Sequence, residues 1–151
     1  PDSALASLDW GRGVWTYKNT WYWSSLSCYA GDKRVGFNLG YGFGDTSAAS
    51  ENMLFVEDTA YKLGRLNFGI PGEGTRKIDF LSEWHFTDDE GKVDLIFKPD
   101  IDRCDKLSLG IITTDQHQVF GRFFGKIAYG EVKEIVFDGQ RGFAEKVYNA
   151  W

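Results

Sequence analysis

The chain has 151 residues, a length that fits one domain around a single hydrophobic core. Its 17 Lys and Arg residues and 22 Asp and Glu residues give a net charge of −5, with the two signs interspersed along the chain. Because a nucleic-acid partner requires clustered positive charge, this pattern argues against nucleic-acid binding. The uncharged stretches are short and rich in Gly, Ser and Tyr, so we expect no stable membrane insertion.

Aromatic side chains make up 17% of the chain and 18 residues are Gly, a balance that favours strands and turns. Bulky and small residues alternate between clusters of turn residues, which predicts successive antiparallel strands. In chain order, the expected strands are residues 21–29, 34–43, 52–57, 60–67, 83–88, 92–98, 107–114, 117–129, 131–138 and 141–151. We also expect a short helix at residues 46–51, with Asp45 as its N-cap.

An antiparallel meander of this kind must hide its edges, so we predict an all-β fold that closes into a barrel or a strongly curved sandwich. Residues 1–151 form one domain in this interpretation. The chain opens on Pro1 and a dense aromatic motif starts at Leu8, so we expect the C-terminal half of a longer protein. Cys28 and Cys104 are isolated in the sequence, and we expect two free thiols in a reducing cytoplasm.

Residues 36–44 read GFNLGYGFG, with an apolar side chain at every second position. On a strand, the apolar residues from Phe37 to Phe43 face one side, and the glycines face the other side together with Asn38. Three interpretations stay open for the bare side: tight coiling and packing, room for a ligand inside a barrel, or an interface with another element. The second interpretation makes Asn38 and Tyr41 candidate ligand-binding residues.

Polar residues follow this tract directly. Asp45, Glu51 and Asn52 would therefore lie near the end of the strand, where a barrel cavity would open. Capping and turn formation are the ordinary roles of such residues. A buried Glu51 or Asp45 would instead have a raised pKa and could act as a catalytic acid. Asn52 would then be a ligand-binding neighbour.

The first part of the chain, LDWGRGVWTYKNTWYW at residues 8–23, is dense in indole rings. Such clusters usually form a hydrophobic core. They also line sites for sugars, polyenes or carbocation-like intermediates, because the ring faces attract positive charge. We therefore name Trp10, Trp21 and Trp23 as candidate ligand-binding residues.

His117 lies in the motif DQHQVFGRFFG, and it shares one strand face with Asp115. An Asp–His pair would make His117 a candidate catalytic residue, and the alternative is a core or turn histidine. Gln118 and Arg122 lie on the other face as candidate ligand-binding residues, and Arg122 could pair with Asp45, Glu51 or a ligand carboxylate. Two His and two Cys at these distances do not predict a metal site, and no cofactor motif is present.

Five motifs, LDWGRGVW, WYWSS, GFNLGYGFGDTSAASENMLF, DQHQVFGRFFG and GFAEKVYNAW, span nearly the whole chain. Together they resemble the C-terminal half of the domain-of-unknown-function family number twenty-eight zero four. That family is distantly similar to lipocalin-like (calycin-type) two-barrel proteins, which include hydroxyneurosporene synthase and tocopherol cyclase relatives. The resemblance implies a lipocalin-like barrel, and a prenyl or polyene substrate that a buried acid protonates while aromatic rings stabilise the cation.

Three functions are open at this stage. The first is a barrel that binds a hydrophobic or amphipathic small molecule in a cavity against the Gly-rich face. The second is an acid-assisted hydratase, cyclase or isomerase acting on an isoprenoid-like substrate, with Glu51 or Asp45 as the acid. The third is a structural half that packs against the N-terminal half of the full-length protein, with the site between them.

Overall fold

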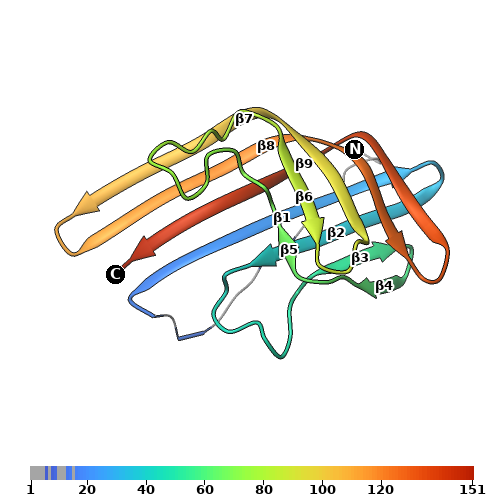
Figure 1. Ribbon diagram of the computed structural model, residues 1–151, viewed down its shortest axis with the longest axis horizontal. Coiled ribbons are helices and arrows are strands. Elements are labelled where there is room, and N and C mark those ends of the chain that lie inside the picture. Colours follow the sequence, from blue (N-terminus) through green and yellow to red (C-terminus); the bar gives the residue numbers. More distant parts are fainter. Residues whose placement is uncertain (1–5, 7, 10–12, 15) are drawn as a thin grey trace.

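The computed structural model describes residues 6, 8–9, 13–14 and 16–151, and this part of the chain contains nine β-strands and no helix. It therefore holds no helix long and apolar enough to cross a lipid bilayer. The predicted all-β antiparallel fold is confirmed (Figure 1). The strands are β1 (Lys18–Ala30), β2 (Lys33–Tyr41), β3 (Met53–Val56), β4 (Thr59–Lys62), β5 (Leu66–Asn67), β6 (Trp84–Asp88), β7 (Val93–Leu109), β8 (Ile112–Tyr129) and β9 (Lys133–Ala150).

All nine strands belong to one sheet, in the order β4-β3-β2-β1-β9-β8-β7-β6-β5. Two meanders, β1 to β4 and β5 to β9, are joined in the middle because the first and last strands pair with each other. The sheet curls strongly into a half-barrel (Figure 1). The strands at its two ends, β4 and β5, are connected only by residues 63–65. Since Lys62 and Leu66 are four residue steps apart, these two strand ends lie within about 14 Å of each other, and the two edges of the curled sheet must approach each other.

The Asn52 side chain joins β2 to the segment that connects β4 and β5. Its side-chain oxygen accepts a hydrogen bond from the backbone N–H of Gly40 at 2.7 Å, and its amide donates to the carbonyl of Gly64 at 3.0 Å. The side chain is only 1% exposed. Because a buried amide must be fully hydrogen-bonded, this arrangement gives Asn52 a structural role between β2 and that connecting segment.

The concave face of the sheet is filled by apolar rings. Residues 68–83 lie across this face, and Phe68 stacks on Phe86 with ring centroids 4.1 Å apart. Phe37 packs edge-to-face on Phe123 at 5.0 Å. The expectation of a ligand cavity enclosed by the barrel is therefore wrong, because the returning segment and the core side chains occupy that space. The largest fully buried side chains are Trp84, Phe37, Phe68, Phe86, Phe97, Phe123 and Phe137.

The turns of the first three hairpins form as predicted, but the strand expected at residues 60–67 is two strands, β4 and β5, which lie at opposite ends of the sheet. The C-terminal strands are longer than expected. β7 and β8 turn at Gly110, which has a φ of +62°, and not at residues 115–116. β9 is continuous where a turn was expected at residues 139–140. Gly139 instead forms a β-bulge, with a φ of +87°, at the point where the β8–β9 register shifts. A glycine with positive φ signals both features, so the sequence alone could not separate a turn from a bulge.

The helix predicted at residues 46–51 is also wrong, since this segment has no regular secondary structure. Asp45 does cap backbone, but in a turn: its carboxylate accepts a hydrogen bond from the N–H of Ser47 at 2.9 Å. Asp and Ser side chains satisfy local N–H groups equally well in turns and at helix starts, which explains the error.

Candidate functional site

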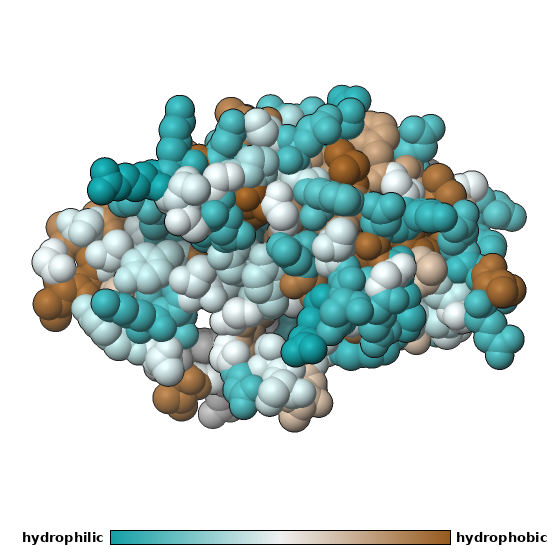
Figure 2. All heavy atoms as spheres, in the orientation of Figure 1, coloured by the Kyte–Doolittle hydropathy of each residue, from teal (hydrophilic) through white to brown (hydrophobic). Residues whose placement is uncertain are grey.

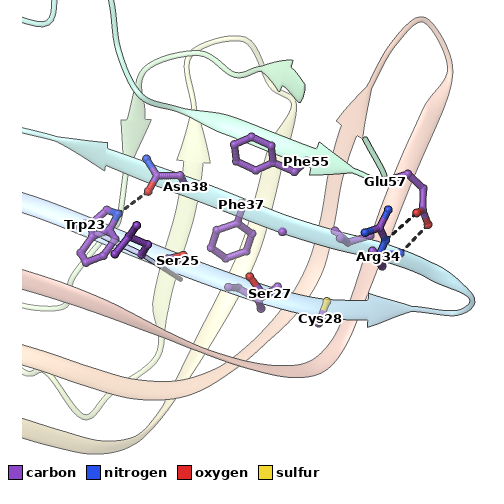
Figure 3. Close-up of a pocket in the computed structure, with 13 residues that line it drawn as sticks. Trp23, Ser25, Ser27, Cys28, Arg34, Phe37, Asn38, Phe55 and Glu57 are labelled. Atoms are coloured by element: carbon purple, nitrogen blue, oxygen red, sulfur yellow. Dashed lines mark hydrogen bonds and ion pairs between the residues drawn. The ribbon is translucent and has the colours of Figure 1, made fainter. Parts of the chain in front are cut away.

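The convex face of β1 and β2 carries a groove made of two adjoining pockets, which share Leu8, Trp23 and Asn38. The first has a volume of about 450 Å³ and runs over Gly36 towards Arg34 (Figure 3). The second has a volume of about 550 Å³ and is lined by Leu8, Asp9, Asn19, Trp21, Trp23, Asn38, Gly42, Phe43, Glu51, Glu145 and Trp151. We call the two pockets together the convex groove.

The groove is hollow because small residues face each other across its floor. In the β1–β2 register, Ser27 lies opposite Gly36 and Ser25 lies opposite Asn38. The bare side of the Gly-rich tract is thus real, as the alternation predicted. It faces outward from the convex side, however, and not into the barrel, because the Phe37 side is buried in the core.

Phe43 differs from its predicted position on the apolar face of the tract. β2 ends at Tyr41, and Phe43 then returns to the convex side. There its ring stacks on Trp21 with the centroids 6.0 Å apart. A Cβ atom at Gly40 would lie 3.0 Å from the Phe43 ring, so the glycine makes room for this return.

Trp23 is held in place at the centre of the groove. Its indole N–H donates to the Asn38 side-chain oxygen at 2.6 Å (Figure 3). The Asn38 amide donates in turn to the backbone carbonyl of Glu51 at 3.2 Å. On its other side the indole packs edge-to-face against Phe143 at 4.8 Å. The two contacts fix an aromatic wall between the two pockets, and they bring together Trp23 and Asn38, which the sequence offered separately as candidate ligand-binding residues.

Glu145 on β9 supplies the carboxyl group of the groove. It accepts hydrogen bonds from the Trp21 indole at 3.2 Å and from the Gln118 amide at 3.3 Å. Burial raises the pKa of Glu145 above its ordinary value, the two hydrogen bonds oppose this rise, and the nearby Asp9 carboxylate adds to it. The groove therefore contains a half-buried acid beside indole rings.

Sequence reasoning missed Glu145 although it stands in the motif GFAEKVYNAW. The only available signal was one acid among apolar residues on an alternating strand. The β1–β9 register, which places Glu145 opposite Trp23, could not be read from the sequence. Gln118, by contrast, was predicted as a ligand-binding residue and does lie at this carboxyl group.

Several other predicted site residues take different positions. Glu51 is exposed at the rim of the groove, so it lacks the burial on which its predicted role as an acid depended. Asp45 is also exposed, and the hydrogen bonds from Ser47 lower its pKa. Arg122 pairs with Asp100 at 3.4 Å and not with Asp45. The predicted residue Trp10 lies outside the described residues.

Tyr41 and His117 lie on the concave side of the sheet, away from the groove. Tyr41 stacks on Tyr22 at 4.2 Å, and burial raises its pKa. The predicted pair of His117 and Asp115 is present, with Nε2 and Oδ1 3.4 Å apart. Its closer partner is Asp102, whose Oδ2 lies 2.7 Å from Nδ1.

Comparisons with known proteins identify a family but no activity. A family model described as "Domain of unknown function (DUF2804)" matches residues 1–151. No curated protein and no solved structure matches the chain.

Proposed function

We propose that this chain, which belongs to the DUF2804 family of unknown function, binds a small amphipathic molecule in the convex groove. The observation that supports the proposal is the combination of indole rings with one half-buried carboxyl group in an open hollow. Both pocket volumes fall in the range of about 300–1,000 Å³ that is usual for small-molecule sites.

The apolar part of such a ligand would lie against Trp21, Trp23 and Phe43. Its polar end would meet Glu145, which has further hydrogen-bonding capacity beside the two bonds it accepts. Among the described residues that line the second pocket there are three acids and no Lys or Arg. An alcohol or amine is therefore favoured over a carboxylate as the head group, by charge and by cation–π attraction.

A matched series of ligands tests this proposal. Hexadecanol, hexadecylamine and hexadecanoate share one alkyl chain and differ in the head group, and binding is measured by tryptophan fluorescence and thermal shift. We expect the alcohol and the amine to bind, and Glu145→Gln to weaken the amine about tenfold by removing a charge-assisted hydrogen bond. Val136→Ser is the control, because Val136 is an exposed residue of β9 outside the groove. Equal effects of both variants, or no binding at all, would rule the proposal out.

A second candidate function is acid-assisted chemistry on an isoprenoid-like substrate. The observation that favours it is the raised pKa of Glu145 beside aromatic rings, which makes this residue a better proton donor than Glu51 or Asp45. Incubation with geranylgeraniol in D₂O, followed by mass spectrometry, tests it. Deuterium incorporation that disappears in Glu145→Gln supports the candidate, and incorporation that the variant leaves unchanged rejects it.

A third candidate is the packing of this chain against the N-terminal half of a longer protein. It is favoured by the exposed apolar residues at the β7–β8 tip, which are Leu107, Leu109, Ile111 and Ile112 (Figure 2). Hydrogen exchange of these residues, with and without the N-terminal half, tests it. Slower exchange at the tip supports the candidate, and unchanged exchange in a complex rejects it.

We also propose a cytoplasmic location. Cys28 and Cys104 are both free, as predicted, whereas secreted domains of this size commonly pair their cysteines. Fractionation of cells that produce the tagged protein tests the proposal, and recovery outside the cytoplasm contradicts it.

A further inference from the structure

Three side chains with metal-binding atoms meet on the concave face of β7 and β8, away from the convex groove. Cys104 lies directly opposite His117 in the strand register, and Asp102 precedes Cys104 by two residues on the same face. One ligand atom from each residue lies within 4.8 Å of the others. We propose that Asp102, Cys104 and His117 bind a single zinc ion, a function independent of the groove.

The donor set fits zinc better than a hard cation such as calcium or magnesium. Zinc takes thiolate sulfur, imidazole nitrogen and carboxylate oxygen, whereas calcium and magnesium take oxygen ligands. In a tetrahedral zinc site these ligand atoms lie about 3.3–3.6 Å apart. Separations near the 4.8 Å limit must therefore shorten by about one ångström. The 2.7 Å between Oδ2 of Asp102 and Nδ1 of His117 must lengthen by roughly half an ångström, and neither change alters the strand register.

A buried oxygen atom at this cluster, without a hydrogen-bond partner in the described part of the chain, also indicates a cation. Oδ1 of Asp102 is buried, and no other described residue offers it a hydrogen bond. The other oxygen, Oδ2, lies 2.7 Å from Nδ1 of His117, close enough for the two atoms to share a proton. A zinc ion in place of this proton would coordinate both the imidazole nitrogen and the carboxylate whose Oδ1 lacks a hydrogen-bond partner among the described residues.

The surroundings hold the imidazole ring but leave one side of the cluster open. Phe80 stacks on the His117 ring with the centroids 3.7 Å apart, and Asp115 lies 3.4 Å from Nε2. Asp115 is itself held by Lys106. Cys104 is exposed, so solvent reaches the thiol side. Three protein ligands with an open fourth position are typical of catalytic or exchangeable zinc sites and not of closed structural ones.

A second histidine pair in the same protein provides an internal control. His85 on β6 lies 2.8 Å from Asp94 on β7, almost the separation seen in the His117 pair. Both side chains are mostly exposed, and neither belongs to a cluster with a cysteine among the described residues. If a His–Asp pair alone bound zinc, both sites would bind it equally.

Titration of the full chain with Co²⁺ and Zn²⁺, after removal of metals with a chelator, tests the proposal. We expect one equivalent of Co²⁺ to bind with a sulfur-to-cobalt charge-transfer band, and Zn²⁺ to displace it. Cys104→Ser should abolish the band, and His117→Gln and Asp102→Asn should each weaken binding about tenfold or more. Cys28→Ser and His85→Gln should leave the band and the affinity within about twofold. Circular dichroism confirms that each variant is folded.

Three results would overturn the proposal. The first is a folded wild-type chain that binds neither metal. The second is a charge-transfer band that persists in Cys104→Ser or is lost in Cys28→Ser. The third is alkylation of Cys104 at the same rate with and without saturating Zn²⁺, which would indicate a free thiol beside a histidine and no metal ligand.

Discussion

The indole N–H of Trp21 donates a hydrogen bond to the Glu145 carboxyl group at 3.2 Å, across the pairing of the first and last strands of the sheet. This contact joins residues 124 positions apart in the sequence. It places a half-buried acid beside an aromatic wall on the outside of the half-barrel. The second pocket of the convex groove depends on this pairing, because it is the one place in the described part of the chain where strands of the two meanders are hydrogen-bonded to each other.

The carboxyl group of Glu145 should make stability depend on pH. Burial raises its pKa, so the folded chain favours the protonated form. This contribution to stability is fully present below the ordinary carboxyl pKa of about 4.3 and is lost as the pH rises through the raised value. Glu145→Gln removes the titration. Its free energy of unfolding, relative to wild type, should therefore increase between about pH 4 and 7, as measured by urea denaturation.

Glu51→Gln is the matched control for that measurement, since Glu51 is an exposed carboxyl at the rim of the same groove. We expect it to follow the pH dependence of the wild type. A Glu145→Gln variant whose stability difference from wild type stays flat over this range would contradict the prediction.

The two hydrogen bonds that the Asn52 side chain makes with Gly40 and Gly64 should contribute strongly to the stability of the fold. Asn52→Ala removes the hydrogen-bond partner of the buried N–H of Gly40 and of the half-buried carbonyl of Gly64. We expect a loss of about 2–4 kcal/mol in the free energy of unfolding. Gln116→Ala, at an exposed position of β8, should change it by less than about 0.5 kcal/mol. Equal losses in the two variants would show that these hydrogen bonds contribute little.

The two cysteines should differ strongly in reactivity. Burial raises the pKa of Cys28 to about 11, so its reactive thiolate is scarce at neutral pH. Cys104 is exposed. In the presence of a chelator, we expect a disulfide reagent to label one thiol rapidly and one slowly. Cys104→Ser should remove the rapid phase and Cys28→Ser should remove the slow one, and a single rate for both thiols would contradict this assignment.

Glu73 should hold the segment that crosses the concave face. It accepts hydrogen bonds from the Lys146 ammonium at 2.9 Å and from the Tyr22 hydroxyl, both on the sheet. Glu73→Ala should speed amide exchange in residues 68–83, because the segment loses this anchor. The control is Glu83→Ala, which removes an exposed ion pair with Lys98 near the end of that segment. Faster exchange in both variants alike would reject the specific role of Glu73.

The cluster of Asp102, Cys104 and His117, on which the zinc proposal rests, could not be predicted from the sequence. The separation between Cys104 and His117 argued against a metal site, because known zinc motifs place their ligands close together in sequence. The β7–β8 register brings the two residues directly opposite each other. Register depends on the position of the turn at Gly110, and the sequence pattern placed that turn five residues too late, at Asp115.

The sequence by itself determined the all-β class, the turns of the first three hairpins and the two faces of the Gly-rich tract as far as Tyr41. Side chains alternate with a period of two on any strand, so these features follow from local order alone. Only the tertiary structure decided which face is inside. The rings from Phe37 onwards bury more apolar surface than the glycines, so the sheet curls around them and turns the bare side outward. The meeting of Trp21 with Glu145 then depends on the pairing of distant strands, which no local pattern specifies.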